Sequence, residues 1–342
     1  MSFSLLARKY RGAIIQSRVS PISRSATILT FALMTIGLVS SIATKFTLTS
    51  LPNIMPLVVY VVVLDVLSQF APQTRVVDAV RTLLYGVLYF VITILCGVLA
   101  AYAMQRFAFP LQDQLLARAD MAVGLNWSDF AHWVDGHAGI QRILHFAYDT
   151  IKVQIALPLV VLAFTNRISE VRVYLLAFAI AFIATIVVSA LMPAAGPIIF
   201  VDRSTFNILQ FTGATPLEHL TRLREAGPFI MSDPPGGIAT FPSFHATVAV
   251  LTLLTLRRYP RILVPLLILN TAMLVGTVTE EAHYFCDVLA GSCMAFLAYA
   301  LAKRIISLED RSTQPVSRRA NSSRAAGDDP TLTEQVEAGA SS

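Results

Sequence analysis

Two short polar strings, set in an otherwise apolar sequence, contain the residue types that could do chemistry. The first, Phe241 to Ala246, reads Phe-Pro-Ser-Phe-His-Ala, and the second, His283 to Gly291, reads His-Tyr-Phe-Cys-Asp-Val-Leu-Ala-Gly. Each string lies at the start of a long apolar run. An imidazole at the start of a membrane helix carries a free-energy cost, which makes a functional role worth testing. The two strings are therefore the first candidates for a functional site.

The second string contains a histidine and a carboxylate four residues apart. In a helix, His283 and Asp287 would share a face and could hydrogen-bond. A carboxylate on one imidazole nitrogen fixes the tautomer and makes the other nitrogen a better base or nucleophile. The pairing also explains Asp287, which lies one turn into an apolar run. The alternative is a histidine at a helix start that is merely satisfied by a nearby acid.

The first string combines a hydroxyl with the other histidine. Free N–H groups at a helix start attract anions, and Ser243 could add a donor to the same cluster of oxygens. His245 would then lie close enough to protonate a leaving alkoxide. The alternative is a Pro-Ser helix cap followed by an incidental histidine.

A metal site is a different chemistry that the same residues could support. His245, His283 and Asp287 could supply three zinc ligands. Neither string has the paired-histidine spacing that is usual for metal sites. We therefore expect a site without a metal.

The composition places these strings in a membrane protein. The chain has 342 residues, of which 55% are apolar and 14% are charged, and its mean hydropathy is +0.65. An average soluble domain has about 25% charged residues, so the class is polytopic membrane protein. The net charge is +5, but the basic residues lie in short clusters beside apolar runs. That pattern is typical of membrane orientation and excludes a nucleic-acid partner.

Eight apolar runs are candidate spans. They are Ala26 to Ala43, Ile54 to Phe70, Thr82 to Met104, Phe146 to Phe164, Val173 to Met192, Thr240 to Leu256, Ile262 to Val278 and His283 to Ala302. Residues 1–25 are basic and contain no acid, which predicts a cytoplasmic N-terminus and, after eight spans, a cytoplasmic C-terminus. Both histidine strings then lie at the outer ends of their spans.

Two long outer segments accompany the spans. Leu111 to Trp133 mixes apolar and charged residues at helical spacing, which predicts a helix in the membrane interface with Trp127 and Trp133 at headgroup level. An ordinary loop helix is the alternative. Pro193 to Ile238 is rich in Pro, Gly and charge and leads into the first string, which favours a functional loop.

Taken together, the two strings resemble the second and third signature motifs of the type 2 phosphatidic acid phosphatase superfamily, in order and in separation. The resemblance implies an all-α bundle whose six-helix core, here 82–302, gathers its motifs at one membrane face. The chain then divides into a basic cytoplasmic N-terminus at 1–25, two accessory transmembrane helices within 26–81, this core, and a disordered cytoplasmic tail at 303–342.

The resemblance also implies a role for each residue of the strings. His283 matches the nucleophile that forms a phosphohistidine, and Asp287 matches the acid that orients it. His245 matches the general acid for the leaving group, and Ser243 a phosphate-binding hydroxyl. That scheme needs neither a metal nor another cofactor.

Three departures from the general family pattern point to one of its branches. Phe244 stands where the family has glycine, Gly276 and Thr277 stand where it has a Ser-Arg pair, and Met192 to Pro197 replaces its Lys and Arg-Pro motif. These changes resemble the branch that contains the inositol phosphorylceramide synthases. With the usual cations missing, Arg203, which follows the Pro-rich stretch, is the first candidate to bind the phosphate.

We therefore expect an integral membrane enzyme of a bacterial-type plasma membrane, acting on a lipid phosphate at the extracytoplasmic face. Its partners are the lipid substrate and the bilayer. Water as acceptor gives a lipid phosphatase, and a lipid alcohol gives a phosphotransferase of the inositol phosphorylceramide synthase kind. Two other classes stay open: a transporter or scaffold with polar residues along a pathway, and an enzyme relic that binds lipid without turnover.

Overall fold

The computed structural model describes residues 20–49, 74–207, 214–225, 227–231, 237–238 and 240–313, together with single positions at 56, 59, 63, 64 and 66. The chain divides into two compact units, Met1–Ala302 and Lys303–Ser342. The expected span from Ile54 to Phe70 lies outside the described residues except at those single positions. Most of the expected N-terminus at 1–25 and most of the tail lie outside them too.

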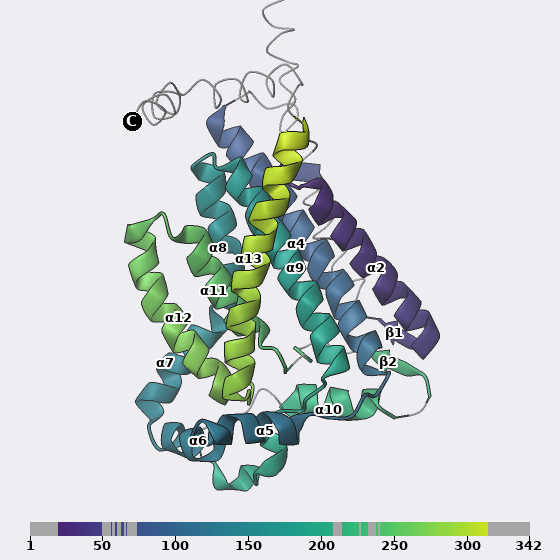
Figure 1. Ribbon diagram of the computed structural model, residues 1–342, viewed down its shortest axis with the longest axis vertical. Coiled ribbons are helices and arrows are strands. Elements are labelled where there is room, and N and C mark those ends of the chain that lie inside the picture. Colours follow the sequence, from purple (N-terminus) through teal and green to yellow (C-terminus); the bar gives the residue numbers. More distant parts are fainter. Residues whose placement is uncertain are drawn as a thin grey trace, which may run out of the picture. The chain divides into compact units, whose positions relative to one another are not determined.

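The described part is built almost entirely from helices (Figure 1). The α-helices are α2 (Arg24–Thr44), α4 (Arg75–Gln105), α5 (Asp113–Ala122), α6 (Trp127–Asp135), α7 (Ala138–Asp149), α8 (Ile151–Phe164), α9 (Ile168–Leu191), α10 (Ala214–Leu223), α11 (Phe244–Leu256), α12 (Pro260–Glu280) and α13 (Phe285–Thr313). Two 3₁₀ turns, η2 (Pro197–Phe200) and η3 (Arg203–Thr205), follow α9. The expected all-α class is confirmed.

Five of the described helices are long and apolar enough to cross a membrane: α2, α4, α9, α12 and α13. A sixth span results if α7 and α8, which meet at a 48° bend, are counted together. Helix α11 has only 13 residues, and an untilted span of the hydrocarbon core needs about 20. The polytopic architecture is therefore confirmed, whereas the expected number of eight spans is not.

Local capping explains where two of the expected spans differ from the helices. The apolar pattern predicts a span from Thr240, whereas α11 begins at Phe244, because Ser243 is the N-cap and its side chain accepts from the N–H of Ala246. The pattern predicts a span from His283 to Ala302, whereas α13 begins at Phe285 and continues to Thr313. Both histidine strings thus straddle helix starts, where backbone N–H groups are free to bind other partners.

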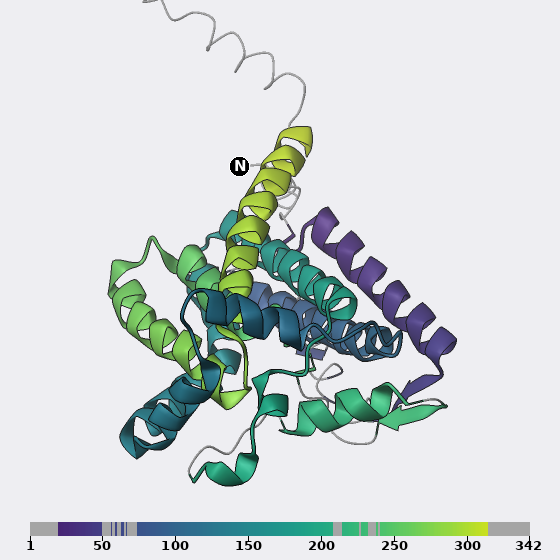
Figure 2. The same cartoon turned by 60° about the horizontal axis from the view of Figure 1, so that its bottom comes forward.

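Three short helices, α5, α6 and α10, lie across one end of the long helices (Figures 1 and 2). The single interfacial helix expected at Leu111 to Trp133 is wrong, since α5 and α6 are separate elements. Trp127 is buried and donates from Nε1 to the carbonyl of Val278 at 2.8 Å. Trp133, by contrast, is half exposed.

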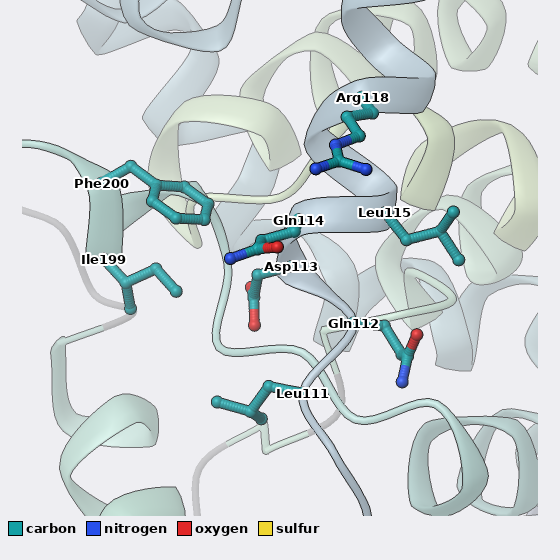
Figure 3. A pocket seen from close by; sticks show the side chains of 8 residues that line it. All are labelled: Leu111, Gln112, Asp113, Gln114, Leu115, Arg118, Ile199 and Phe200. Carbon is teal, nitrogen blue, oxygen red and sulfur yellow. The ribbon is translucent and has the colours of Figure 1, made fainter.

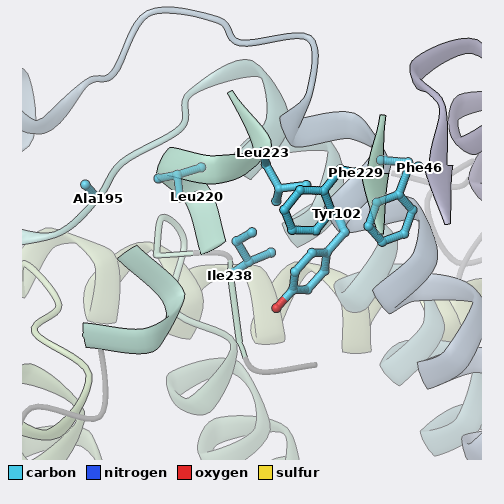
Figure 4. Packing of buried hydrophobic residues seen from close by; sticks show 8 residues of the cluster. Phe46, Tyr102, Ala195, Leu220, Leu223, Phe229 and Ile238 are labelled. Atoms are coloured by element: carbon cyan, nitrogen blue, oxygen red, sulfur yellow. The ribbon is translucent and has the colours of Figure 1, made fainter. Parts of the chain in front are cut away.

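The second long segment is also folded where it is described. Strand β1 (Phe46–Leu48) pairs in parallel with β2 (Phe229–Met231). Beside this pair, rings and aliphatic side chains from β1, α4, α10 and β2 point toward one another (Figure 4). The cluster contains Phe46, Tyr102, Ala103, Ala195, Leu220, Leu223, Phe229 and Ile238. Its packing fixes α10 and β2 against the end of α4.

The two strings meet where α11 crosses α13 at Gly291. A Cβ on Gly291 would overlap the carbonyl oxygen of Ser243 and lie 3.2 Å from Cβ of Ala246. Thr247 donates its hydroxyl to the carbonyl of Gly291 at 2.9 Å. Glycine is therefore required here for the close approach of the two helices.

Gly291→Ala tests this packing. We expect the substitution to destabilise the protein by about 1–3 kcal/mol, because the added methyl overpacks the crossing. Gly139→Ala is the matched control, since nothing lies within 4 Å of a Cβ at that helical position. Thermal unfolding in detergent should show a lower Tm for Gly291→Ala and an unchanged or higher Tm for Gly139→Ala. Equal Tm values for the two variants would contradict the close crossing.

Candidate active site

The structure brings His283 and Asp287 together as the spacing predicted. Nδ1 of His283 lies 3.1 Å from Oδ2 of Asp287. The same carboxylate oxygen accepts the backbone N–H of Tyr284 at 2.9 Å. The side chains of His283 and Asp287 are only 2% and 0% exposed. Asp287 thus holds the buried imidazole of His283 in one orientation and leaves Nε2 to face the rest of the site.

The first string places His245 opposite this pair. His245 lies in the first turn of α11, and its ring stacks on that of Tyr148 from α7, with centroids 4.3 Å apart. The backbone N–H of Ser243 donates to the carbonyl of Asp287 at 3.0 Å, which ties the two strings directly. Three of the four string residues with expected roles, His245, His283 and Asp287, therefore converge from two segments nearly 40 residues apart in sequence.

Ser243 is fully buried, and its hydroxyl oxygen accepts from the N–H of Ala246 at 3.3 Å. This contact is the helix cap that the sequence offered as the alternative interpretation. The hydroxyl proton stays available for one further acceptor. Phosphate binding by Ser243 thus stays a prediction beside its capping role.

A second acid, Glu281, lies between the two histidines. Its Oε2 is 3.2 Å from Nδ1 of His245 and 3.2 Å from Nε2 of His283. Burial alone would raise the pKa of Glu281, but the charges of the histidines and the hydrogen bonds to them hold that pKa well below its usual range. Burial likewise opposes the charged form of His283, yet Asp287 and Glu281 raise its pKa to about 9. At neutral pH the pair is an imidazolium and a carboxylate.

Two further acids hold backbone segments next to the two histidine strings in place. Asp113 and Asp120 lie on α5 and are both 3% exposed. Asp113 accepts the N–H groups of Ala195 and Gly196 and the hydroxyl of Tyr284. Neither residue was among the candidates that the sequence pattern indicated. Their spacing of seven residues on an amphipathic helix was the available signal.

Asp120 fixes the start of α13. Its two carboxylate oxygens accept the N–H groups of Phe285 and Cys286 at 2.7 and 2.8 Å. Because these are free N–H groups of a helix start, a buried carboxylate there satisfies them and complements the helix dipole. The acid thereby sets the position of the turn that presents His283.

Asp120→Ala should destabilise the protein by about 2–5 kcal/mol, because it leaves two buried N–H groups without their charged acceptor. We also expect lower turnover, since the start of α13 loses its anchor. Asp129→Ala removes an exposed carboxylate from the neighbouring α6 and should cost less than about 1 kcal/mol. Chemical unfolding in detergent measures both. A variant of Asp120 as stable as that of Asp129 would show that the two hydrogen bonds are dispensable.

The Pro-rich stretch reaches the same place. Gly196 has φ +90°, and a Cβ there would lie 2.5 Å from the carbonyl oxygen of Ala282. Ala194 packs with Leu116 and Tyr284 in one apolar cluster. The stretch from Met192 to Pro197 therefore lies against the residue that precedes His283, as expected from the order of the motifs.

A cavity of about 460 Å³ opens beside this junction (Figure 3). Asp113, Gln114 and Arg118 turn toward it from α5, and Ile199 and Phe200 from η2. Arg118 is exposed and brings a cation to the cavity. The backbone of Arg203 begins η3, but its side chain lies outside the described part, so its role as phosphate-binding cation stays a prediction.

The site contains the buried, oriented imidazole of His283 and, facing it, the imidazole of His245. Oε2 of Glu281 lies between the two rings, 3.2 Å from each. That geometry suits attack by one histidine and proton transfer by the other. Within the part of the chain that the structure describes, no group of three or more histidines, cysteines and acids is placed to hold a metal ion.

Comparison with known proteins agrees with the two strings. The family model of the PAP2 superfamily, the type 2 phosphatidic acid phosphatases, matches residues 114–301, which is more than half of the chain. The matched range includes both histidine strings, α5 from Gln114 onward and the Pro-rich stretch. No curated protein and no solved structure shows significant similarity to the chain.

Proposed function

Because the chain belongs to the PAP2 superfamily, we propose that it is a membrane phosphoesterase that acts on a lipid phosphate through a phosphohistidine. Members of the superfamily are typically phosphatases, and the long apolar helices fit a substrate held in a bilayer. The observation that carries the proposal is the convergence of the oriented His283 with His245 across a single oxygen position.

The reaction consists of two displacements at phosphorus. Nε2 of His283 attacks phosphorus while His245 gives a proton to the leaving oxygen. Asp287 keeps Nδ1 of His283 occupied, since the two lie 3.1 Å apart, and stabilises the positive charge that develops on the ring. An acceptor then attacks the phosphohistidine while His245 takes the acceptor's proton. The chain's own residues suffice for each step, so we propose a reaction that is independent of metal.

The phosphate needs cations that the two strings do not contain. Arg203 follows the Pro-rich stretch, and Arg118 faces the cavity beside Asp113. Either guanidinium could hold a phosphate oxygen with two parallel N–H donors. We propose this pair, together with Ser243, as the residues that bind the substrate phosphate.

The acceptor decides between a lipid phosphatase and a headgroup transferase of the inositol phosphorylceramide synthase kind. We propose that the site faces the extracytoplasmic side, with both termini in the cytoplasm, because residues 1–25 carry basic residues and no acid. On that side both water and lipid alcohols reach a phosphohistidine. The departures at Phe244, Gly276 and Thr277 favour the transferase as the alternative outcome.

One experiment separates these possibilities. The purified protein is reconstituted in vesicles with radiolabelled phosphatidate, prenyl diphosphate or phosphatidylinositol, each with and without ceramide or another lipid alcohol. Released phosphate without an alcohol indicates a phosphatase, and label on the alcohol indicates a transferase. Labelled lipid that binds without turnover indicates a relic, and label that crosses the bilayer unchanged indicates a transporter. Either of the last two results would contradict the proposed enzyme.

A further inference from the structure

Glu281 is the acid of the site that the two displacements leave without a role. Its Oε2 lies 3.2 Å from Nδ1 of His245 and 3.2 Å from Nε2 of His283. A phosphorus atom under attack by His283 must lie between the same two nitrogens, since the second histidine has to reach the leaving oxygen. The carboxylate of Glu281 therefore fills the place of the phosphoryl group.

The surroundings hold this carboxylate in place. The hydroxyl of Tyr148 is hydrogen-bonded to Glu281, and a Cβ on Gly237 would lie 3.3 Å from its Oε1. The Glu281 side chain is 18% exposed, whereas that of His283 is only 2% exposed. Oε2 of Glu281 is thus the hydrogen-bond partner of Nε2 of His283, and the carboxylate is the more exposed of the two groups.

Resting on the function proposed above, we propose that Glu281 is a third catalytic residue, a carboxylate that holds the phosphoryl position until the substrate displaces it and then accepts the Nε2 proton of His283. Displacement of the Glu281 carboxylate and transfer of the Nε2 proton to it occur together. A phosphate ester drives the carboxylate out by occupying its place, and the proton leaves with the carboxylate. The nucleophile is therefore released only when phosphorus is present to receive it.

The protons balance in this scheme. In the free protein Nε2–H of His283 faces the Glu281 carboxylate, and a protonated Nε2 has no lone pair for attack. On displacement the N–H bond breaks and an O–H bond forms on Glu281. The N–P bond then forms as the P–O bond breaks, and the leaving oxygen takes its proton from His245. Glu281, now a neutral acid, no longer repels the phosphate and can donate its O–H to a phosphoryl oxygen.

Other groups that face this pair contribute to its titration. Asp287 contacts His283 from α13, His245 contacts Glu281 from α11, and Tyr148 contacts Glu281 from α7. Glu280 and Asp149 lie within electrostatic reach of Tyr148. Substitutions at Glu281 leave these groups in place, so a changed pH profile reports the pair itself.

The first test measures binding of inorganic phosphate, which needs no turnover. Glu281→Gln keeps the shape of the side chain but removes the charge that competes with the anion. We expect it to bind phosphate about tenfold more tightly than the wild type at pH 7, because like-charge repulsion is lost. Glu218→Gln, on the exposed side of α10, should leave the affinity unchanged. Equal or weaker binding by Glu281→Gln would overturn the claim that Glu281 holds the phosphoryl position.

The second test measures the acid limb of kcat/KM, which reports the free enzyme. In the wild type the proton of His283 passes to Glu281, so activity persists below the pKa of the imidazole, which is about 9. In Glu281→Gln the proton has to leave to solvent before His283 can attack, so kcat/KM should fall once the pH drops below the pKa of His283 in that variant. The acid limb should therefore lie about one unit or more above that of the wild type. A merely structural residue would lower the rate without moving the limb. Coincident limbs would exclude the proton transfer.

Glu281→Asp separates the two roles and guards against a folding defect. A shorter carboxylate can accept a proton but reaches both histidines less well, so we expect tighter phosphate binding with an unchanged acid limb. NMR of protein labelled with ¹⁵N-histidine adds a readout without substrate: loss of the Nε2 proton of His283 should occur at lower pH in Glu281→Gln. If no lipid is turned over, the proposed function fails, whereas phosphate binding and the NMR titration still decide the role of Glu281.

Discussion

His283→Ala is expected to lower the turnover of the lipid phosphate on the order of 10⁴-fold or more, because it removes the atom that forms the covalent bond to phosphorus. The effect should lie in kcat, since the substrate phosphate and lipid chains keep their other contacts. The variant should also fail to trap phosphate: alkaline quenching of wild-type turnover should yield a base-stable, acid-labile phosphoprotein, and His283→Ala should yield none. Rapid-quench experiments with radiolabelled substrate measure both quantities.

His137→Ala is the matched control for this prediction. His137 is exposed, and its Nδ1 lies 2.7 Å from the carbonyl oxygen of Trp133. The same change of side chain there should leave turnover and trapping at wild-type values. Wild-type turnover in His283→Ala would remove the phosphohistidine from the mechanism. Loss of turnover with normal trapping of label would place the nucleophile elsewhere.

The sequence predicted the helical class because membrane spans need long apolar runs, and α2, α4, α9, α12 and α13 are of that kind. It did not predict the bend between α7 and α8, which falls at Thr150 inside the expected span from Phe146 to Phe164. Hydropathy is averaged over a long window, so it does not register a local change in helix direction. It also did not predict the short β1–β2 pairing, which joins segments about 180 residues apart.

The candidate site was predictable to the extent that its chemistry is local. His283 and Asp287 are four residues apart, and their expected contact is present, although His283 lies two residues before the start of α13. Asp113 and Asp120 could not be placed in the same way, because their partners lie about 80 to 170 residues away in the chain. Glu281 was closer at hand, two residues before His283, but its contact with His245 depends on how α11 meets α12.

Two kinds of carboxylate therefore share the site. Asp113 and Asp120 accept backbone N–H groups and hold segments in place, whereas Glu281 contacts the two imidazoles. Asp287 does both, since it contacts His283 and accepts the N–H of Tyr284. Loss of an acid that positions the backbone should affect stability and turnover together. Loss of Glu281 should affect protonation, with a smaller effect on stability. The pH profile and the unfolding curve of each variant separate the two groups.

His245→Gln is expected to lower kcat/KM for a lipid phosphate about 10²- to 10⁴-fold, the usual contribution of a general acid. The leaving group of a lipid phosphate is an alkoxide, which departs poorly unless it is protonated. Glutamine keeps a polar side chain on the first turn of α11, beside Tyr148, but cannot supply that proton.

The same variant should retain activity within about tenfold on a p-nitrophenyl phosphate ester, whose leaving oxygen is acidic enough to depart without a proton. This contrast separates general-acid catalysis from a defect in binding or folding, because such a defect would lower both activities alike. His137→Gln should leave both unchanged. An equal loss on the two substrates would contradict proton donation by His245. Glu281 bridges Nδ1 of His245 and Nε2 of His283 at 3.2 Å on each side, and the space between these two nitrogens would then serve substrate binding alone.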